Sequence, residues 1–380
     1  MLSRGIRQLP SCRFMLRRRH RLNFATCTSA SLAPPRRHRP LVHLSSAPGA
    51  KFGGQLIGTP HPVVPHEVTS AVRHVDSSVP VPWYADGSLV AGGEDVRYDE
   101  EEAEQNDTCN SMLTPDQTEC ARVLGRITRQ ALGHALSLLR EGITTDEIDE
   151  SVHNYIVSQY AYPSLLRYRG FPKSTATNVN EVVSLGVPDL RPIEAGDVIT
   201  IVICCFKDGL HCSASETVIV DGSEVMDEEM LDDSQNSRLK RSKLLVGASR
   251  DLLDEVIREA SKPGTTIGDI DAAIHKAAGS REYRLVKRLV GHGIGAELNC
   301  PPYIEIGSGR SSRDDSSTRL KPGVMLSISP ILVEGHSACA QWSNGHTLAT
   351  VDGGISAQFG ATILLTDDGA EVLTGAPARQ

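Results

Sequence analysis

The residues of this chain best suited to chemistry are one histidine and a group of cysteines. His292 lies in the sequence Gly-His-Gly-Ile-Gly at 291–295. Three cysteines, Cys204, Cys205 and Cys212, lie in one β-rich block before it, and Cys300 follows it. Thiolates and imidazoles together bind zinc, so Cys204 and His292 could hold a soft metal ion. Buried thiols that pack as small hydrophobic side chains explain the same residues without a metal, and we favour this second interpretation.

Three serines could act as nucleophiles, namely Ser213, Ser215 and Ser329. A serine nucleophile needs a general base and a third group that orients the base. The sequence offers His292 as the base and nothing to orient it, so we do not predict a serine nucleophile. One imidazole without carboxylate partners also cannot hold a hard dication against water, and His292 is expected to be a hydrogen-bonded pocket residue.

Two strands must position these groups. Val-Ile-Thr-Ile-Val-Ile-Cys-Cys-Phe runs into a Lys-Asp-Gly turn at 207–209, and Glu-Thr-Val-Ile-Val follows, which predicts a hairpin over 196–217. Side chains alternate between the faces of a strand, so Cys204 is expected on the same face as Val202. Upstream, Thr-Pro-Asp-Gln from Thr114 predicts a helix that begins with a capping box.

An internal repeat relates the two parts of the chain. Gly142-Ile-Thr-Thr-Asp-Glu-Ile-Asp and Gly264-Thr-Thr-Ile-Gly-Asp-Ile-Asp align at an offset of 122 residues, which also aligns His153 with His275. In both copies a glycine ends one helix, a threonine caps the next, and strands follow. We therefore predict a duplicated α+β unit that forms a single domain.

Composition and charge set the remaining limits. The chain has 380 residues, of which 39% are hydrophobic and 23% charged, as in globular proteins. Aromatic residues make up 4%, which disfavours a nucleic-acid reader based on stacking, and no direct nucleic-acid motif is present. No apolar run is long enough to span a membrane. The nine cysteines lack zinc-finger spacing and are expected to be reduced thiols.

The N-terminal region differs from the rest of the chain. The first acidic residue is Glu67, and ten arginines and Lys51 precede it. This composition is typical of a mitochondrial presequence; a basic nucleic-acid arm or a disordered tail are the alternatives. The predicted organisation is a presequence with a Pro/Arg-rich linker at 1–60, an extension at 61–112, which holds an acidic surface segment, and one domain at 113–373. Two polar inserts, at 222–243 and 307–319, are expected to be surface loops.

Several motifs resemble one protein family. They are the stretch 170–189, which begins Gly-Phe-Pro-Lys-Ser-Thr-Ala-Thr-Asn-Val and ends Gly-Val-Pro-Asp, the 196–217 hairpin, Gly-His-Gly-Ile-Gly at 291–295, Ile-Ser-Pro at 328–330 and Ser-Ala-Gln-Phe-Gly-Ala-Thr-Ile at 356–363. Together they resemble the type I methionine aminopeptidases, and most closely the organellar branch. These enzymes belong to the creatinase/aminopeptidase superfamily, so the resemblance implies its α+β pita-bread fold, a pseudo-twofold duplication.

The resemblance also implies where a catalytic centre would lie. The enzymes hold two divalent metals with two aspartates, one histidine and two glutamates, and a bridging water becomes the nucleophile. The matching positions in this chain are Val202, Ser213, His292, Ser329 and Gly360. The four carboxylates are missing, so we predict that no metal is bound and that no cofactor is needed.

The substrate-facing positions of the family are altered as well. Two histidines of the family correspond to Leu185 and Asn299, and a tryptophan over the site corresponds to His346. No catalytic residue of the family is intact. Any remaining pocket is expected to include His292, Cys204, Cys212 and His346.

The sequence thus predicts a methionine-aminopeptidase-like pseudoenzyme of the mitochondrial matrix. It would act as a binding or assembly module for a nascent N-terminus or the organellar ribosome. The alternative is an active metalloaminopeptidase that removes N-terminal Met with a rebuilt site, in which Cys204 and His292 hold zinc. A cavity without the four carboxylates would also suit a neutral or hydrophobic ligand.

Overall fold

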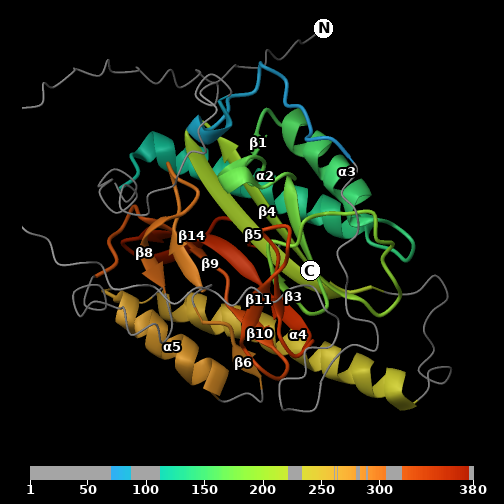
Figure 1. Ribbon diagram of the computed structural model, residues 1–380. Coiled ribbons are helices and arrows are strands. Elements are labelled where there is room, and N and C mark those ends of the chain that lie inside the picture. Colours follow the sequence, from blue (N-terminus) through green and yellow to red (C-terminus); the bar gives the residue numbers. More distant parts are fainter. Residues whose placement is uncertain are drawn as a thin grey trace, which may run out of the picture. The chain divides into compact units, whose positions relative to one another are not determined.

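The computed structural model describes residues 70–86, 112–220, 233–304 and 319–375, apart from 261, 263, 280–282 and 288–289. The predicted presequence, residues 222–232 of the first insert and residues 307–318 of the second therefore lie outside the described residues. The described part divides into two α+β halves. Figure 1 shows the helices of the first half at the top and those of the second half at the bottom.

The first half begins with the arm, residues 70–86, which ends in the short helix η1 (Trp83–Ala85). Its main helices are α2 (Pro115–Leu138) and α3 (Thr145–Ser158). Thr114 and Thr144 cap them with capping boxes, as predicted for Thr114. The remaining elements are β1 (Tyr162–Pro163), η2 (Tyr168–Gly170), β2 (Thr175–Val179), β3 (Val182–Ser184), β4 (Val198–Lys207) and β5 (Leu210–Ile219).

The second half has the same order of helices and strands. Its helices are α4 (Asp233–Ala260) and α5 (Ile267–Gly279). The first strands are β6 (Arg284–Leu285), β7 (Gly291–Gly293), β8 (Cys300–Ile304), β9 (Met325–Ile328) and β10 (Ile331–Val333). The last are β11 (Cys339–Gln341), β12 (Leu348–Thr350), β13 (Ser356–Gln358), β14 (Gly360–Thr366) and β15 (Gly369–Val372).

One expectation about the second half is wrong. Residues 233–243 belong to α4 and not to a surface loop. Their arginines, lysines and leucines are good helix formers, but their apolar residues are too sparse to show a helical period. Ser242 is nevertheless buried where α4 packs on the rest of the half.

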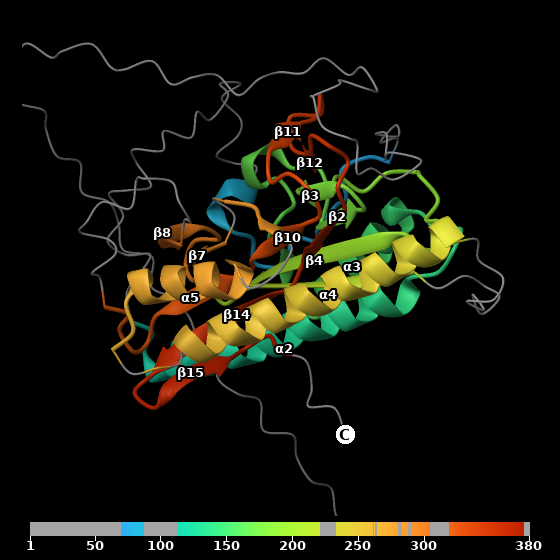
Figure 2. The same cartoon turned by 90° about the horizontal axis from the view of Figure 1, so that it is seen from below.

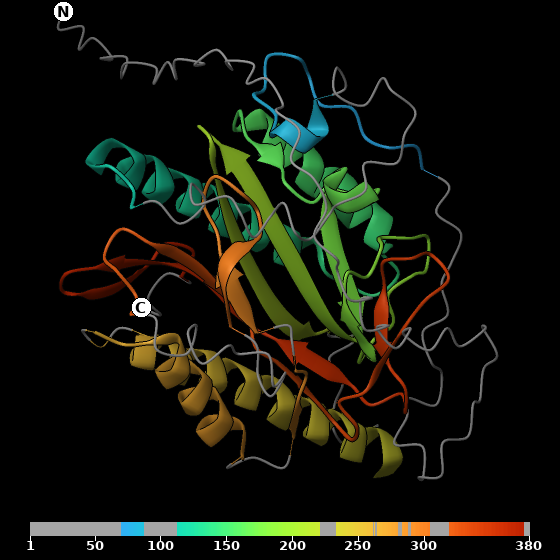
Figure 3. The same cartoon turned by 60° about the vertical axis from the view of Figure 1, so that its left-hand side comes forward.

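The halves meet in one large sheet. Its strand order is β1-β4-β5-β14-β9-β7-β8, with β2 paired to β4 and β15 paired to β14. Figure 2 shows α2 and α4 running along one side of this sheet, with β3, β11 and β12 on its other side. Figure 3 shows the long β4–β5 hairpin between the helices of the two halves. Each helix pair packs on the sheet over its own core: Leu124, Leu132 and Ile201 in the first, Leu252, Ile270 and Ile363 in the second.

The predicted duplication is confirmed by the strand register. In the first half Tyr162 pairs with Phe206, and in the second half Arg284 pairs with Val333. The next pairs agree as well, since Pro163 faces Cys205 and Leu285 faces Leu332. The threonine caps also repeat: the backbone N–H of Thr144 and that of Thr266 each donate to an acidic side chain three residues on, 2.8 Å away in both halves.

Candidate functional site

Five strands bring the family-matched positions to one face of the sheet. Val202 pairs with Ser215, and Ser215 pairs with Gly360. On the next strands Thr362 pairs with Ser327, and Ser327 pairs with His292. Directly paired side chains share a face of an antiparallel sheet, and side chains two residues apart do too. Ser213 and Ser329 therefore complete the same face, which we call the convergent face.

Hydroxyl groups hold the convergent face together across the two halves. The Oγ atoms of Ser213 and Ser327 lie 2.7 Å apart, which joins β5 to β9. The backbone N–H of Ser213 donates to Thr362 Oγ1 at 2.8 Å, and that hydroxyl donates to the carbonyl of Ser213 at 2.9 Å. Neutral hydrogen bonds thus connect the strands at the point where the two halves meet.

Gly360 is closely surrounded. A Cβ atom added there would lie 2.5 Å from Ser215 Oγ and 2.8 Å from Ser329 Cβ. Both distances are shorter than real Cβ contacts, so a larger residue at this position would force its neighbours to move. The contacts also show that Gly360, Ser215 and Ser329 lie together, as the sequence predicted for two of them.

His292 has a defined tautomer. Its Nδ1 lies 2.9 Å from the carbonyl oxygen of Gly293. A carbonyl only accepts hydrogen bonds, so Nδ1 carries the proton and the Nε2 lone pair is available. Burial lowers the pKa of this imidazole, and the hydrogen bond to Gly293 opposes that shift. At neutral pH His292 is a neutral acceptor.

Comparison with known proteins decides the family of this chain. The model of "Metallopeptidase family M24" matches residues 119–367, most of the described part. The chain belongs to metallopeptidase family M24. Within the family it is related to the methionine aminopeptidases, as its motifs suggested.

Two relatives and one solved structure illustrate this relationship. "Methionine aminopeptidase 1" of Dictyostelium discoideum is 33% identical over 313 residues, 82% of this chain and 78% of the relative. "Methionine aminopeptidase 1D, chloroplastic/mitochondrial" of Arabidopsis thaliana is 36% identical over 256 residues, 67% of each chain. The crystal structure of methionine aminopeptidase from Rickettsia prowazekii superposes with a TM-score of 0.62 at 29% identity, covering 70% of this chain and all of that one. The pita-bread fold predicted from the sequence is confirmed.

The residues of the convergent face do not fit the two divalent metals of the family. Val202 and Gly360 have no side-chain donor, and Ser213 and Ser329 offer only neutral hydroxyls. Hard dications need several anionic oxygens, and His292 alone supplies none. Across the described ranges, no group of three or more His, Cys, Asp or Glu side chains could hold a metal ion. We therefore derive no catalytic step through a metal.

The cysteines are divided between the two faces of the sheet. Cys204 pairs with Ser213 and shares its face, as expected. Cys212 lies on the opposite face, where its Sγ is 4.0 Å from the carbonyl of Ala121 on α2, so the prediction that it shares a pocket with His292 is wrong. The reason is the strand alternation between Cys212 and Ser213. Burial raises the pKa of Cys204, which keeps it a thiol.

Among the described cysteines, Cys300 is the oxidised one. Cys300, on β8, is part of a disulfide bond, so the prediction of reduced thiols is wrong for this residue. Its sulfur is not a free ligand for the proposed soft-metal site. Sequence spacing could not indicate this bond, because only the fold brings its two sulfurs together.

Two of the substrate-facing positions, Leu185 and His346, lie beside each other. Leu185 has a positive φ of 51° and a side chain that is partly exposed. Its carbonyl accepts a hydrogen bond from Thr347 Oγ1 at 3.0 Å, which places it beside His346. The His346 ring meets Phe171 edge to face at 5.4 Å between centroids, and Asn299 has a buried Oδ1 with no hydrogen-bond partner among the described residues.

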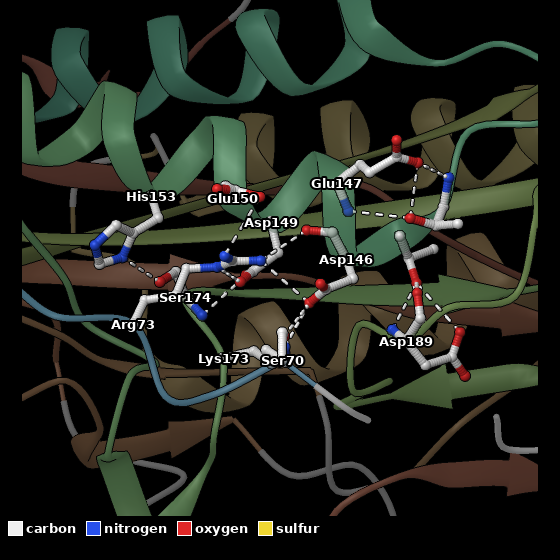
Figure 4. Close-up of polar contacts among 12 residues, drawn as sticks. Ser70, Arg73, Asp146, Glu147, Asp149, Glu150, His153, Lys173, Ser174 and Asp189 are labelled. Atoms are coloured by element: carbon white, nitrogen blue, oxygen red, sulfur yellow. Dashed lines mark hydrogen bonds and ion pairs between the residues drawn. The ribbon is translucent and has the colours of Figure 1, made fainter. Parts of the chain in front are cut away.

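The sequence did not predict a second polar cluster, between the arm and α3. Asp149 is fully buried and accepts four hydrogen bonds, including one of 2.8 Å from Arg73 Nε on the arm. Lys173 is 1% exposed and contacts both Asp146 and Ser70. Figure 4 shows these side chains directed toward one another from α3, the arm and the start of β2. The only sequence signal was the repeat, which aligns Asp149 with Asp271.

His153 makes this cluster sensitive to pH. Its Nε2 donates to the carbonyl of His74 at 3.0 Å, so its Nδ1, 2.7 Å from Ser174 Oγ, must accept. Burial lowers the pKa of His153 below its usual 6.5. The unfolded chain therefore binds the proton first as the pH falls, and stability is lost below about pH 6.5.

We expect His153→Gln to flatten this pH dependence, because glutamine can keep a hydrogen bond but cannot bind the proton. The free energy of unfolding of both proteins would be measured in urea between pH 7.5 and 4.5. The difference between them should change by up to about 1.4 kcal/mol per pH unit below 6.5. If the free energies of unfolding of the unmodified chain and of His153→Gln changed in parallel with pH, His153 would not be the source of the pH dependence.

None of the helices in the described ranges is both long enough and apolar enough to cross a membrane.

Proposed function

We propose that this chain is an organellar relative of the methionine aminopeptidases that has lost the dimetal reaction and retains the fold as a binding module. The observation that carries the proposal is the convergent face. There the fold assembles all five family-matched positions, and the side chains present are Val202, Ser213, His292, Ser329 and Gly360. The scaffold is kept while the anionic ligands are replaced.

The neutral hydrogen bonds support this proposal. In an enzyme of this family, carboxylates at these positions would repel one another unless a cation lay between them. Here the Ser213–Ser327 bond and the close packing around Gly360 stabilise the same junction without a cation. The fold is therefore expected to be stable when no metal is supplied.

Location and partner complete the proposal. The Arabidopsis relative is named for the chloroplast and mitochondrion, and the first 66 residues of this chain carry eleven basic and no acidic side chains. We place the protein in the mitochondrial matrix, with a nascent N-terminus or the organellar ribosome as its partner. Its face would receive the peptide end without cleaving it.

We expect the purified mature chain to contain close to no bound metal and to release no methionine from a Met-Ala-Ser peptide, with or without added Mn²⁺ or Zn²⁺. Elemental mass spectrometry gives the metal-to-protein ratio, and chromatography detects free methionine. The bacterial methionine aminopeptidase fold neighbour serves as the positive control. Metal-dependent release that is lost in His292→Ala would overturn the proposal.

One observation favours the second candidate, an active aminopeptidase with a rebuilt site. The Nε2 lone pair of His292 is available on the same face as Cys204. One zinc per chain that is lost in both His292→Ala and Cys204→Ala would support this candidate.

A further inference from the structure

The arm fills a groove in the first half of the molecule. Arg73 bonds Asp149 on α3, and the next carbonyl, that of His74, accepts from His153. Farther along the arm, Val79 and Tyr84 pack on Tyr162 of β1 in one buried cluster. The groove thus has an ionic end on α3 and an apolar end beside β1.

The second half contains the same groove. α5 and β6 stand at the positions of α3 and β1, and the pairing of β6 with β10 repeats that of β1 with β4 residue for residue. Asp271 and His275 on α5 correspond to Asp149 and His153 at the 122-residue offset. The arm has only one copy in the described chain, so it fills only one of the two grooves.

The second groove is open. A cavity of about 500 Å³ lies there, and its lining includes His275 and Ala278 of α5, Tyr283, Arg284, Leu285 and, from the turn after β10, His336. This volume lies in the range of ligand sites. Lys287 also lines it, and no carboxylate does so among the described residues. The walls are apolar and the rim is basic.

Asp271 is a partnerless acceptor at the edge of this groove. Its Oδ1 is buried and has no hydrogen bond within the described ranges, and His275 Nε2 lies 3.8 Å from it. The corresponding carboxylate, Asp149, accepts from an arginine. The Asp271 side chain as a whole is 37% exposed, but a buried acceptor oxygen without a partner is costly, so its Oδ1 indicates a missing donor.

We propose that residues 95–102 of this same chain, Asp-Val-Arg-Tyr-Asp-Glu-Glu-Glu, dock in the second groove as the arm docks in the first. The arm enters its groove as Val-Arg-His-Val-Asp at 72–76, and the segment contains Val-Arg-Tyr-Asp at 96–99. Arg97 would bond Asp271, and Tyr98 would pack on Leu285. The acidic residues that follow would meet the basic rim.

The described residues on either side of this segment support a contact within the same chain. Before it, Trp83 Nε1 donates to the Glu297 carboxylate at 3.0 Å. After it, the backbone N–H of Leu113 donates to Gly323 at 3.0 Å. Both acceptors belong to the second half, and Leu320 is bonded to Thr265, directly before α5. The 25 residues between Asp86 and Met112 therefore begin and end on the half that carries the open groove.

Amide hydrogen exchange of the full chain tests the proposal. We expect the amides of 95–102 to exchange about tenfold more slowly than in the free peptide of the same sequence, and Asp271→Asn to abolish this protection, because one charge-assisted hydrogen bond is lost. Asp254→Asn, on the exposed side of α4, is the matched control and should leave it unchanged. Arg97→Asp should remove the protection, and combining it with Asp271→Arg should restore it.

Three results would overturn the proposal. The amides of 95–102 could exchange as in the free peptide, or their protection could persist in Asp271→Asn, which would assign the segment to another surface. Protection that rises with protein concentration would mean that the segment of a second copy fills the groove. The double variant Arg97→Asp/Asp271→Arg must regain the protection that Arg97→Asp loses. A variant that merely fails to fold would not regain it and so cannot support the proposal.

Discussion

Asp149→Ala is expected to lower the free energy of unfolding by about 3–5 kcal/mol, the usual cost of removing one partner of a buried ion pair. Asp149 is fully buried, and its Oδ1 accepts the backbone N–H groups of Ser174 and Thr175 at 2.9 and 2.8 Å. Alanine would leave both donors and part of the Arg73 guanidinium without a partner. The substitution would therefore loosen the arm and the start of β2 together.

Urea unfolding followed by circular dichroism measures this effect. The matched control is Glu150→Ala, one residue along the same helix, whose side chain is 62% exposed and lies 3.7 Å from the same arginine. Its effect should stay below about 1 kcal/mol, as for surface ion pairs. Similar losses in the two variants would show that burial of Asp149 is not what makes the cluster strong.

The fold could be predicted from the sequence because its signals are local and repeated. Thr114 and Thr144 cap helices through side chains three residues away, and such contacts are visible in the sequence itself. The repeat added long-range information, since one offset aligned Asp149 with Asp271 and predicted two equivalent halves. The register of β1 and β6 now confirms that equivalence.

The site was only partly predictable, because it depends on pairings between distant strands. Strand alternation was enough to place Cys204 with Val202. It could not show that Ser213 meets Ser327, which is 114 residues away. Cys212 is close to Cys204 in sequence, but as the neighbour of Ser213 on β5 it lies on the opposite face of the sheet. The arm was also missed, since its single arginine gains significance only when it is buried against α3.

Installing the four family carboxylates, as V202D/S213D/S329E/G360E, is expected to create a metal-dependent fold. Without metal, four anionic groups on one face would repel one another, and the new side chain at position 360 would crowd Ser215 and Ser329. With Mn²⁺, carboxylate oxygens and the available Nε2 of His292 would provide a suitable ligand set. Binding only to the folded state at 100 times the dissociation constant adds about 2.7 kcal/mol of stability.

Thermal unfolding with and without Mn²⁺ measures this gain. The matched control, V202N/S213N/S329Q/G360Q, has nearly the same shape without the charge and should gain no stability from the metal. The unmodified chain should not gain any either. A metal-induced shift in the unmodified chain would contradict the loss of the dimetal site, and no shift in the carboxylate variant would contradict the assignment of the four positions. Methionine release should stay low even in the metal-bound variant, because Leu185 and Asn299 still replace the two substrate-facing histidines.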